Sequence, residues 1–131
     1  MAEHLLATTF RSHKRFALSK FFQAVNDTTR LNIMEVKERV IYQRSDGKGM
    51  EIDVIAQSSC GRVVLVEVKK TQAKTGLPLI EDFQEKFEVY KQQFPEQKIL
   101  PAFLSLGGFT KDALQKCQTY GIGWAEKILH Y

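Results

Sequence analysis

The 131-residue sequence predicts a single α/β domain covering residues 1–131. Two stretches rich in β-branched residues, 52–56 and 63–68, flank a short polar connector, which is typical of an antiparallel hairpin. Aromatic residues then recur at steps of three and four over residues 80–94 and predict an amphipathic helix. Because another strand-like stretch begins at residue 98, this helix is expected to cross over and return the chain to the same sheet.

The elements expected before the hairpin are a helical segment and a strand. Apolar residues recur at roughly helical spacing over residues 3–25, as one long helix or two shorter ones. The polar stretch 26–29 interrupts this pattern, and a first strand is expected to follow and to end near Gln43. The turn-forming segment 45–49 then leads into the second strand at Met50.

A strand, a helix and a final short strand are expected after the crossover helix. The strand over residues 98–106 contains Pro101, which must lie at an edge, at a bulge or at the beginning of the strand. Thr110 is a good amino-terminal cap for the next helix, and Gly121 is expected to end it. Residues 122–125 predict the final strand.

The hairpin carries charged side chains in a register that its loop defines. If residues 59–61 form a three-residue loop with the glycine in the left-handed conformation, Asp53 lies opposite Glu67 and Glu51 lies opposite Lys69. Alternation along the strands then places these four side chains on one face. The other face is expected to be wholly apolar and to comprise Ile52, Val54, Ala56, Val64, Val66 and Val68.

The expected pairing of Asp53 with Glu67 indicates a cation-binding site. Like charges directly opposite each other destabilise a sheet unless a cation lies between them. Magnesium binds carboxylate and carbonyl oxygens and would remove this repulsion. Lys69 lies on the same expected face, where it would position or polarise a water molecule. The alternative is an ordinary solvated ladder of charges, which explains Glu51 opposite Lys69 but not the two facing acids.

Asp53, thirteen intervening residues and Glu67-Val68-Lys69 resemble the signature of the PD-(D/E)XK, or restriction-endonuclease-like, nuclease superfamily. The local sequence around these residues is similar to that of Holliday-junction-resolvase-like and Mrr-like domains. The resemblance implies an αβββαβ core with a mixed sheet flanked by helices. It also implies that Asp53, Glu67 and the Val68 carbonyl bind Mg²⁺ or Mn²⁺, and that Lys69 assists the hydrolytic water.

Three features bear on how far the resemblance extends. Many active members carry another acid on the first helix, whereas residues 11–23 hold no Asp or Glu and Glu3 lies early. Glu51 would be an additional site residue, or else only a salt-bridge partner on the same face. In some members a glutamine and a tyrosine of the crossover helix reach the site, and Gln84 and Tyr90 have an unsuitable spacing for that role.

The charge distribution predicts contact with phosphates. The formal net charge is +4 at pH 7, and the segment from Arg11 to Lys20 contains Arg11, Lys14, Arg15 and Lys20 without an acid. Such a cluster is typical of nucleic-acid binding, in which basic side chains displace counterions from the phosphates. Lys70, beside the expected site, would add a further phosphate contact. The alternative is a solvated helix face.

Composition excludes several other classes of protein. A hydrophobic content of 44% and a charged content of 26% are those of a soluble globular protein. No apolar stretch has the length of a membrane span, and no secretory signal is evident. The two cysteines, Cys60 and Cys117, provide neither a disulfide framework nor a zinc site. We therefore expect a cytoplasmic protein without membrane contact.

The sequence supports three hypotheses about function. The first is a magnesium-dependent nuclease that cleaves DNA rather than RNA. The second is a catalytically inactive domain of the same fold that binds nucleic acid or a protein partner. The third is an oligomerisation module, in which the amphipathic segment 1–25 packs on a second copy of the chain to form a homodimer.

Overall fold

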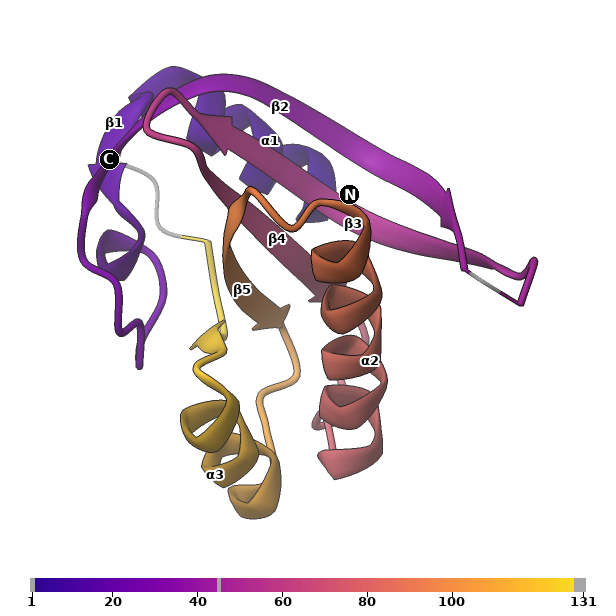
Figure 1. The fold of residues 1–131 in the computed structure, drawn as a ribbon. Helices are drawn as coiled ribbons and strands as arrows, with labels where there is room; N and C mark the ends of the chain where they lie inside the picture. Colours follow the sequence, from indigo (N-terminus) through magenta and orange to yellow (C-terminus); the bar gives the residue numbers. More distant parts are fainter. Residues whose placement is uncertain (1, 45, 129–131) are drawn as a thin grey trace.

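The computed structural model describes residues 2–44 and 46–128, so Ser45 of the predicted turn lies outside the described residues. These residues form a six-stranded mixed sheet with helices on both faces (Figure 1). The strands are β1 (Arg15–Ala17), β2 (Arg30–Gln43), β3 (Gly49–Ser58), β4 (Arg62–Lys69), β5 (Lys98–Ser105) and β6 (Gly123–Ala125). The helices are α1 (Ala2–His13), the 3-10 helix η1 (Leu18–Lys20), α2 (Leu77–Gln93) and α3 (Lys111–Tyr120).

The sheet order is β1-β2-β3-β4-β5-β6. The first four strands pair antiparallel, and β4, β5 and β6 pair parallel. Helix α2 makes the crossover from β4 to β5, and α3 makes the crossover from β5 to β6. The predicted α/β class and the αβββαβ order are therefore confirmed, with β1 as an additional edge strand.

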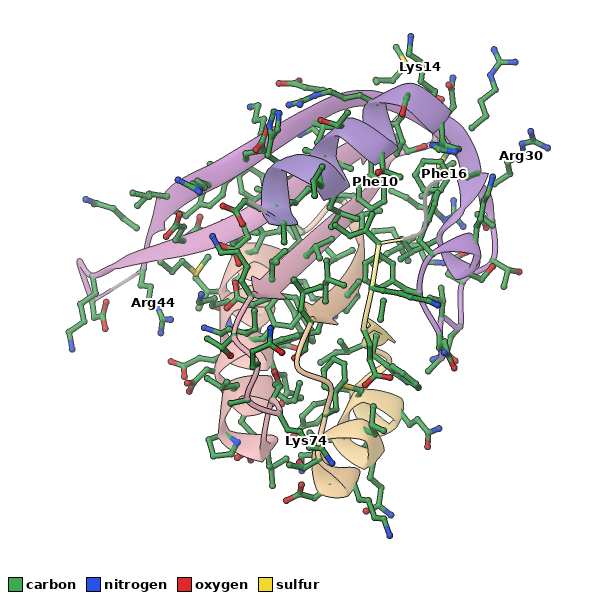
Figure 2. All side chains as sticks on the ribbon, turned by 180° about the vertical axis from the view of Figure 1, so that it is seen from behind. Phe10, Lys14, Phe16, Arg30, Arg44 and Lys74 are labelled. Atoms are coloured by element: carbon green, nitrogen blue, oxygen red, sulfur yellow. The ribbon has the colours of Figure 1, made fainter. Side chains whose placement is uncertain are left out.

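The amino-terminal segment contains one α-helix, whereas we predicted one long helix or two shorter ones over residues 3–25. Helix α1 ends early, and the chain turns at Lys14, whose φ is 51°. The remaining apolar residues form a cluster of aromatic rings: Phe16 lies with its ring centroid 5.3 Å from Phe10 and 5.0 Å from Phe21 (Figure 2). The spacing indicated burial correctly, but a short strand and a 3-10 turn bury these residues instead of a helix.

Two hydrophobic clusters lie on opposite faces of the sheet. One contains the apolar face of α1, and the other contains the buried residues of α2 and α3. The aromatic stripe of α2 belongs to the second cluster, where Phe83, Phe87 and Tyr90 are buried. No helix within the described residues is both long and apolar enough to cross a lipid bilayer.

The β3–β4 hairpin has the predicted register. Gly61 has a φ of 86°, the left-handed conformation that the three-residue loop requires. Val54 pairs with Val66, and Gln57 pairs with Val63. The same register places Asp53 opposite Glu67, just beyond the paired residues.

The uninterrupted alternation that we predicted along β3 is wrong at Asp53. Val54 packs in the cluster below α1, whereas Ile52 packs in the cluster below α2. The change of face occurs opposite Arg39 of β2, which has a left-handed φ of 52°. Such a conformation is rare for a residue with a side chain and cannot be seen in a pattern of hydrophobicity. Glu51, next to Ile52, therefore faces the α1 side.

The carboxy-terminal elements follow the predictions. Thr110 caps α3 by accepting a hydrogen bond from the Ala113 amide at 3.3 Å, and Gly121 ends the helix with a φ of 70°. Pro101 pairs with β4 on one side only, because the β6 ladder begins one residue later, at Ala102. The proline therefore lies at a local edge of the sheet.

Candidate active site

The candidate site lies where β3 and β4 separate. Pairing of the two strands ends at Val54 and Val66. Just beyond this point, Asp53 Oδ2 accepts a hydrogen bond from the main-chain amide of Val68 at 2.8 Å. A side chain thus replaces the missing main-chain partner, and this bond holds the Asp53 carboxylate against β4, beside Glu67.

Lys86 of α2 neutralises the buried carboxylate of Glu67. The Glu67 side chain is only 9% exposed, and its Oε2 accepts a hydrogen bond from Lys86 Nζ at 2.9 Å. The same ammonium donates to the main-chain carbonyl of Glu51, also at 2.9 Å. A positive charge is therefore held between a carboxylate oxygen and a carbonyl oxygen at the fork of the hairpin.

The electrostatics of the site agree with two acids in close proximity. Burial, and next the negative charge of Asp53, raise the pKa of Glu67 to about 7, while the hydrogen bond from Lys86 opposes this rise. We predicted that the facing acids call for a cation. In this structure the ammonium of Lys86 provides one.

The two carboxylates fit a magnesium ion but not a fully protein-ligated metal centre. Across residues 2–44 and 46–128, no group of three or more His, Cys, Asp or Glu side chains is placed to hold a metal ion. Mg²⁺ is commonly bound through one or two carboxylates, with water and substrate phosphates as the other ligands. The amide and carbonyl of a strand residue point to the same side of the strand, so the Val68 carbonyl would be the third oxygen donor to such an ion.

Glu3 is buried at the other side of the fork and does not join the two acids. Its carboxylate accepts hydrogen bonds from Arg39 Nη2 and, at 3.3 Å, from Lys70 Nζ. The bond from Arg39 is the main reason why the pKa of Glu3 falls to about 2. The first helix therefore does carry an acid close to the hairpin, at the early position that we set aside, but two cations neutralise it.

The other residues considered from the sequence have different surroundings. Lys69 ends β4 and is partly exposed, and no ion pair joins it to Glu51 in the part of the chain that the structure describes. Tyr90 donates its hydroxyl hydrogen to Gln97 at 2.7 Å and not to Asp53 or Glu67. The side chain that reaches the site from α2 is Lys86 instead of Gln84 or Tyr90.

Lys86 was not among the predicted site residues, because the charged residues of an amphipathic helix usually lie on its solvated face. A signal was present in its spacing. Lys86 lies three residues after Phe83 and four before Tyr90, which places it on the buried face of α2. A lysine within such an apolar stripe indicates a buried acid on the opposing sheet, and Glu67 is that acid.

The basic amino-terminal residues do not form one helix face. Arg11 belongs to α1 and donates hydrogen bonds to Glu38 and to the main-chain carbonyl of Val36. Lys14 lies in the turn after α1 and Arg15 begins β1, while Lys20 ends η1. In Figure 2, Lys14 extends from the same end of the molecule as Arg30, opposite the end that carries Arg44. The predicted basic residues are thus distributed over α1, the turn after it, β1 and η1.

Comparison with known proteins identifies the fold. No family model and no curated protein matches the sequence. A solved protein of unknown function, AF1548, is 20% identical with a TM-score of 0.67 over 93% of this chain and 54% of its own. EndoMS in its apo form is 11% identical with a TM-score of 0.58, over 100% and 48%. A repair endonuclease from Pyrococcus abyssi is 14% identical with a TM-score of 0.51, over 70% and 39%.

This chain spans about half, or less than half, of the length of these three proteins. At such low identities the likeness concerns the fold. The strand order, the crossover helix and the hairpin described above are those that we predicted for a restriction-endonuclease-like core. The chain therefore has the restriction-endonuclease-like α/β fold and shares it with these solved proteins.

Proposed function

We propose that this chain is a metal-dependent nuclease that hydrolyses phosphodiester bonds in DNA. Asp53 and Glu67 would bind Mg²⁺ or Mn²⁺ together with the Val68 carbonyl, and Lys69 would assist the attacking water. The observation that carries the proposal is the pair of carboxylates at the fork, where the charge of Asp53 helps to raise the pKa of buried Glu67. Two facing acids are costly to a sheet unless they bind a cation.

The protein groups would divide the work as follows. The amide of Val68 fixes the orientation of the Asp53 carboxylate. Lys69, at the end of β4, would direct its ammonium toward the nucleophilic water. Its positive charge would favour the hydroxide form of that water. A bound divalent ion would lower the pKa of that water and stabilise the charge that develops on the phosphate. Lys86 donates a hydrogen bond to Glu67, and its positive charge offsets the negative charge of the two acids before the ion binds.

The substrate is proposed to be DNA because a solved protein of this fold is a repair endonuclease, and repair acts on DNA. Five basic residues, four in the amino-terminal segment and one just after β4, would hold the phosphate backbone without reading sequence. These residues are Arg11, Lys14, Arg15, Lys20 and Lys70. The homodimer expected from segment 1–25 stays a prediction. In this structure the apolar face of α1 packs on the chain's own sheet.

The test is cleavage of a supercoiled plasmid, a branched duplex and a single strand in Mg²⁺, Mn²⁺ or EDTA. Cleavage is expected with either ion and not with EDTA, and Asp53→Asn, Glu67→Gln and Lys69→Ala should each reduce its rate at least 100-fold. Lys111→Ala, in an exposed lysine of α3, is the matched control. Activity that survives the double substitution Glu67→Ala and Lys69→Ala would refute the proposal.

A second candidate is a domain of the same fold that binds nucleic acid without cleaving it. The observation in its favour is that Lys86 already neutralises Glu67 and that Arg39 and Lys70 neutralise Glu3. A gel mobility shift that is equal in EDTA and in Mg²⁺, with no cleavage of the three substrates, would favour this candidate over the nuclease.

A further inference from the structure

Two exposed cations converge on one buried acid beside the candidate active site. Arg39 and Lys70 both donate to the same oxygen, Oε1 of Glu3. The Glu3 side chain is 6% exposed, whereas those of Arg39 and Lys70 are 54% and 48% exposed. The acid is thus buried, and about half of each cationic side chain is exposed to solvent.

The position of this cluster follows from the strands that carry it. The pairs Glu38–Val54 and Val40–Ile52 flank Arg39, so that Arg39 stands opposite Asp53 in the neighbouring strand. Lys70 directly follows Lys69 at the end of β4. The two cations therefore border the fork of the hairpin on the side of α1, while Glu67 and Lys86 lie on the side of α2.

The backbone of Arg39 has a conformation that needs an explanation. Its φ of 52° is left-handed, within the longest strand of the sheet. Non-glycine residues in this region are strained, and such strain concentrates at functional sites. An ion pair whose cation is half exposed returns little stability. The left-handed turn does, however, bring the Arg39 guanidinium to Glu3 and Lys70.

We infer that Arg39 and Lys70, anchored by Glu3, form a subsite for a backbone phosphate of the nucleic-acid strand that enters the site. The inference rests on the proposed function. The subsite would hold a phosphate group that neighbours the scissile phosphate. A guanidinium offers several donors in a fixed fork, so one edge bonds Glu3 while the remaining donors bind phosphate oxygens. Glu51 and Glu38 are the other carboxylates whose charges act on Arg39, and they limit the affinity for the phosphate.

The chain contains a matched control for this cluster. Asp27 Oδ2 accepts one hydrogen bond from Arg62 Nε at 2.7 Å and lies 3.2 Å from Lys98 Nζ, which again gives one acid with one arginine and one lysine. This second cluster involves the beginning of β4 instead of its end. Arg62→Met therefore removes a paired arginine of the same kind at the far end of the hairpin.

The experiment measures binding of a fluorescent DNA duplex in EDTA over a series of salt concentrations. Arg39→Met and Lys70→Met should each weaken binding at least fivefold at low salt and reduce the slope of log affinity against log salt by about 0.9, the value for one lost phosphate contact. Arg62→Met and Lys98→Met should leave the slope unchanged. Circular dichroism and thermal melting check the fold, and Lys70→Met keeps the test valid where Arg39→Met does not fold.

DNA duplexes in which one phosphate at a time is replaced by an uncharged methylphosphonate then locate the phosphate that the subsite binds. One neutralised phosphate should weaken binding by the wild type but not by Arg39→Met. Equal penalties for both proteins at every phosphate, or an equal loss of affinity in Arg39→Met and Arg62→Met, would overturn the subsite. Cleavage that depends on Asp53 but not on Arg39 would leave the nuclease proposal standing alone. Specific binding without cleavage would leave only the subsite, and absence of any binding would overturn both.

Discussion

Glu67→Gln should remove a pH-dependent loss of stability from the protein. Burial and the nearby charge of Asp53 raise the pKa of Glu67 from its ordinary value of 4.5 to about 7. Below pH 4.5 this carboxyl is protonated in both the folded and the unfolded chain. As the pH rises toward 7, the unfolded chain releases the proton first, so that ionisation favours unfolding. The wild type should therefore lose stability relative to the glutamine variant across this interval.

The expected size of the effect follows from the pKa. A rise from 4.5 to about 7 corresponds to roughly 3 kcal/mol at about 1.4 kcal/mol for each pH unit. The side chain is 9% exposed, so solvent screening removes little of it. Loss of the bond to Lys86 in the variant adds a constant offset, and only the pH-dependent part of the difference tests the reasoning.

The assay is urea unfolding from pH 4.5 to pH 8 in EDTA, followed by the fluorescence of the only tryptophan, Trp124. The free energy of unfolding of Glu67→Gln minus that of the wild type should increase by roughly 3 kcal/mol over this range. Adding Mg²⁺ should reduce the difference, because the ion stabilises the ionised carboxylate. Glu85→Gln, on the exposed surface of α2, is the control. A difference that does not change with pH would refute the reasoning.

Two further substitutions test the surroundings of the site. Lys86→Met should bind Mn²⁺ about tenfold more tightly in calorimetric titrations, because the substitution removes a cation held 2.9 Å from Glu67. Equal affinity in the wild type and the variant would contradict this expectation. Lys91→Met is the control. Gly107→Ala should lower the free energy of unfolding by about 1–3 kcal/mol, because the added carbon would clash with the main-chain carbonyl of Ala73. Gly49→Ala, where that carbon would lie 3.4 Å from Ile41, should cost less in the same unfolding assay.

The hairpin and its register could be predicted because local chemistry determines them. The β-branched runs specify strands, and a glycine at position 61 permits the left-handed turn that sets the register. Once the register is known, the proximity of Asp53 and Glu67 follows from strand geometry alone. The same locality explains the correct caps of α3 at Thr110 and Gly121.

The features that could not be predicted depend on contacts between distant parts of the chain. The left-handed conformation of Arg39 is associated with a buried acid on α1, and it changes the face of Glu51. The partnership of Lys86 with Glu67 requires knowing which face of α2 lies on which strand. The aromatic residues around Phe16 have a spacing that suits a helix, yet a turn brings them together. Hydrophobic periodicity indicates that residues are buried, but it does not determine the backbone conformation that buries them.

The position of manganese in a crystal would show whether Asp53 and Glu67 together hold a divalent ion. Anomalous diffraction from a crystal soaked in Mn²⁺ should show one strong peak in contact with both carboxylates, with Lys86 moved away from Glu67 Oε2. A peak at another place, or none at a Mn²⁺ concentration that supports DNA cleavage, would contradict the account.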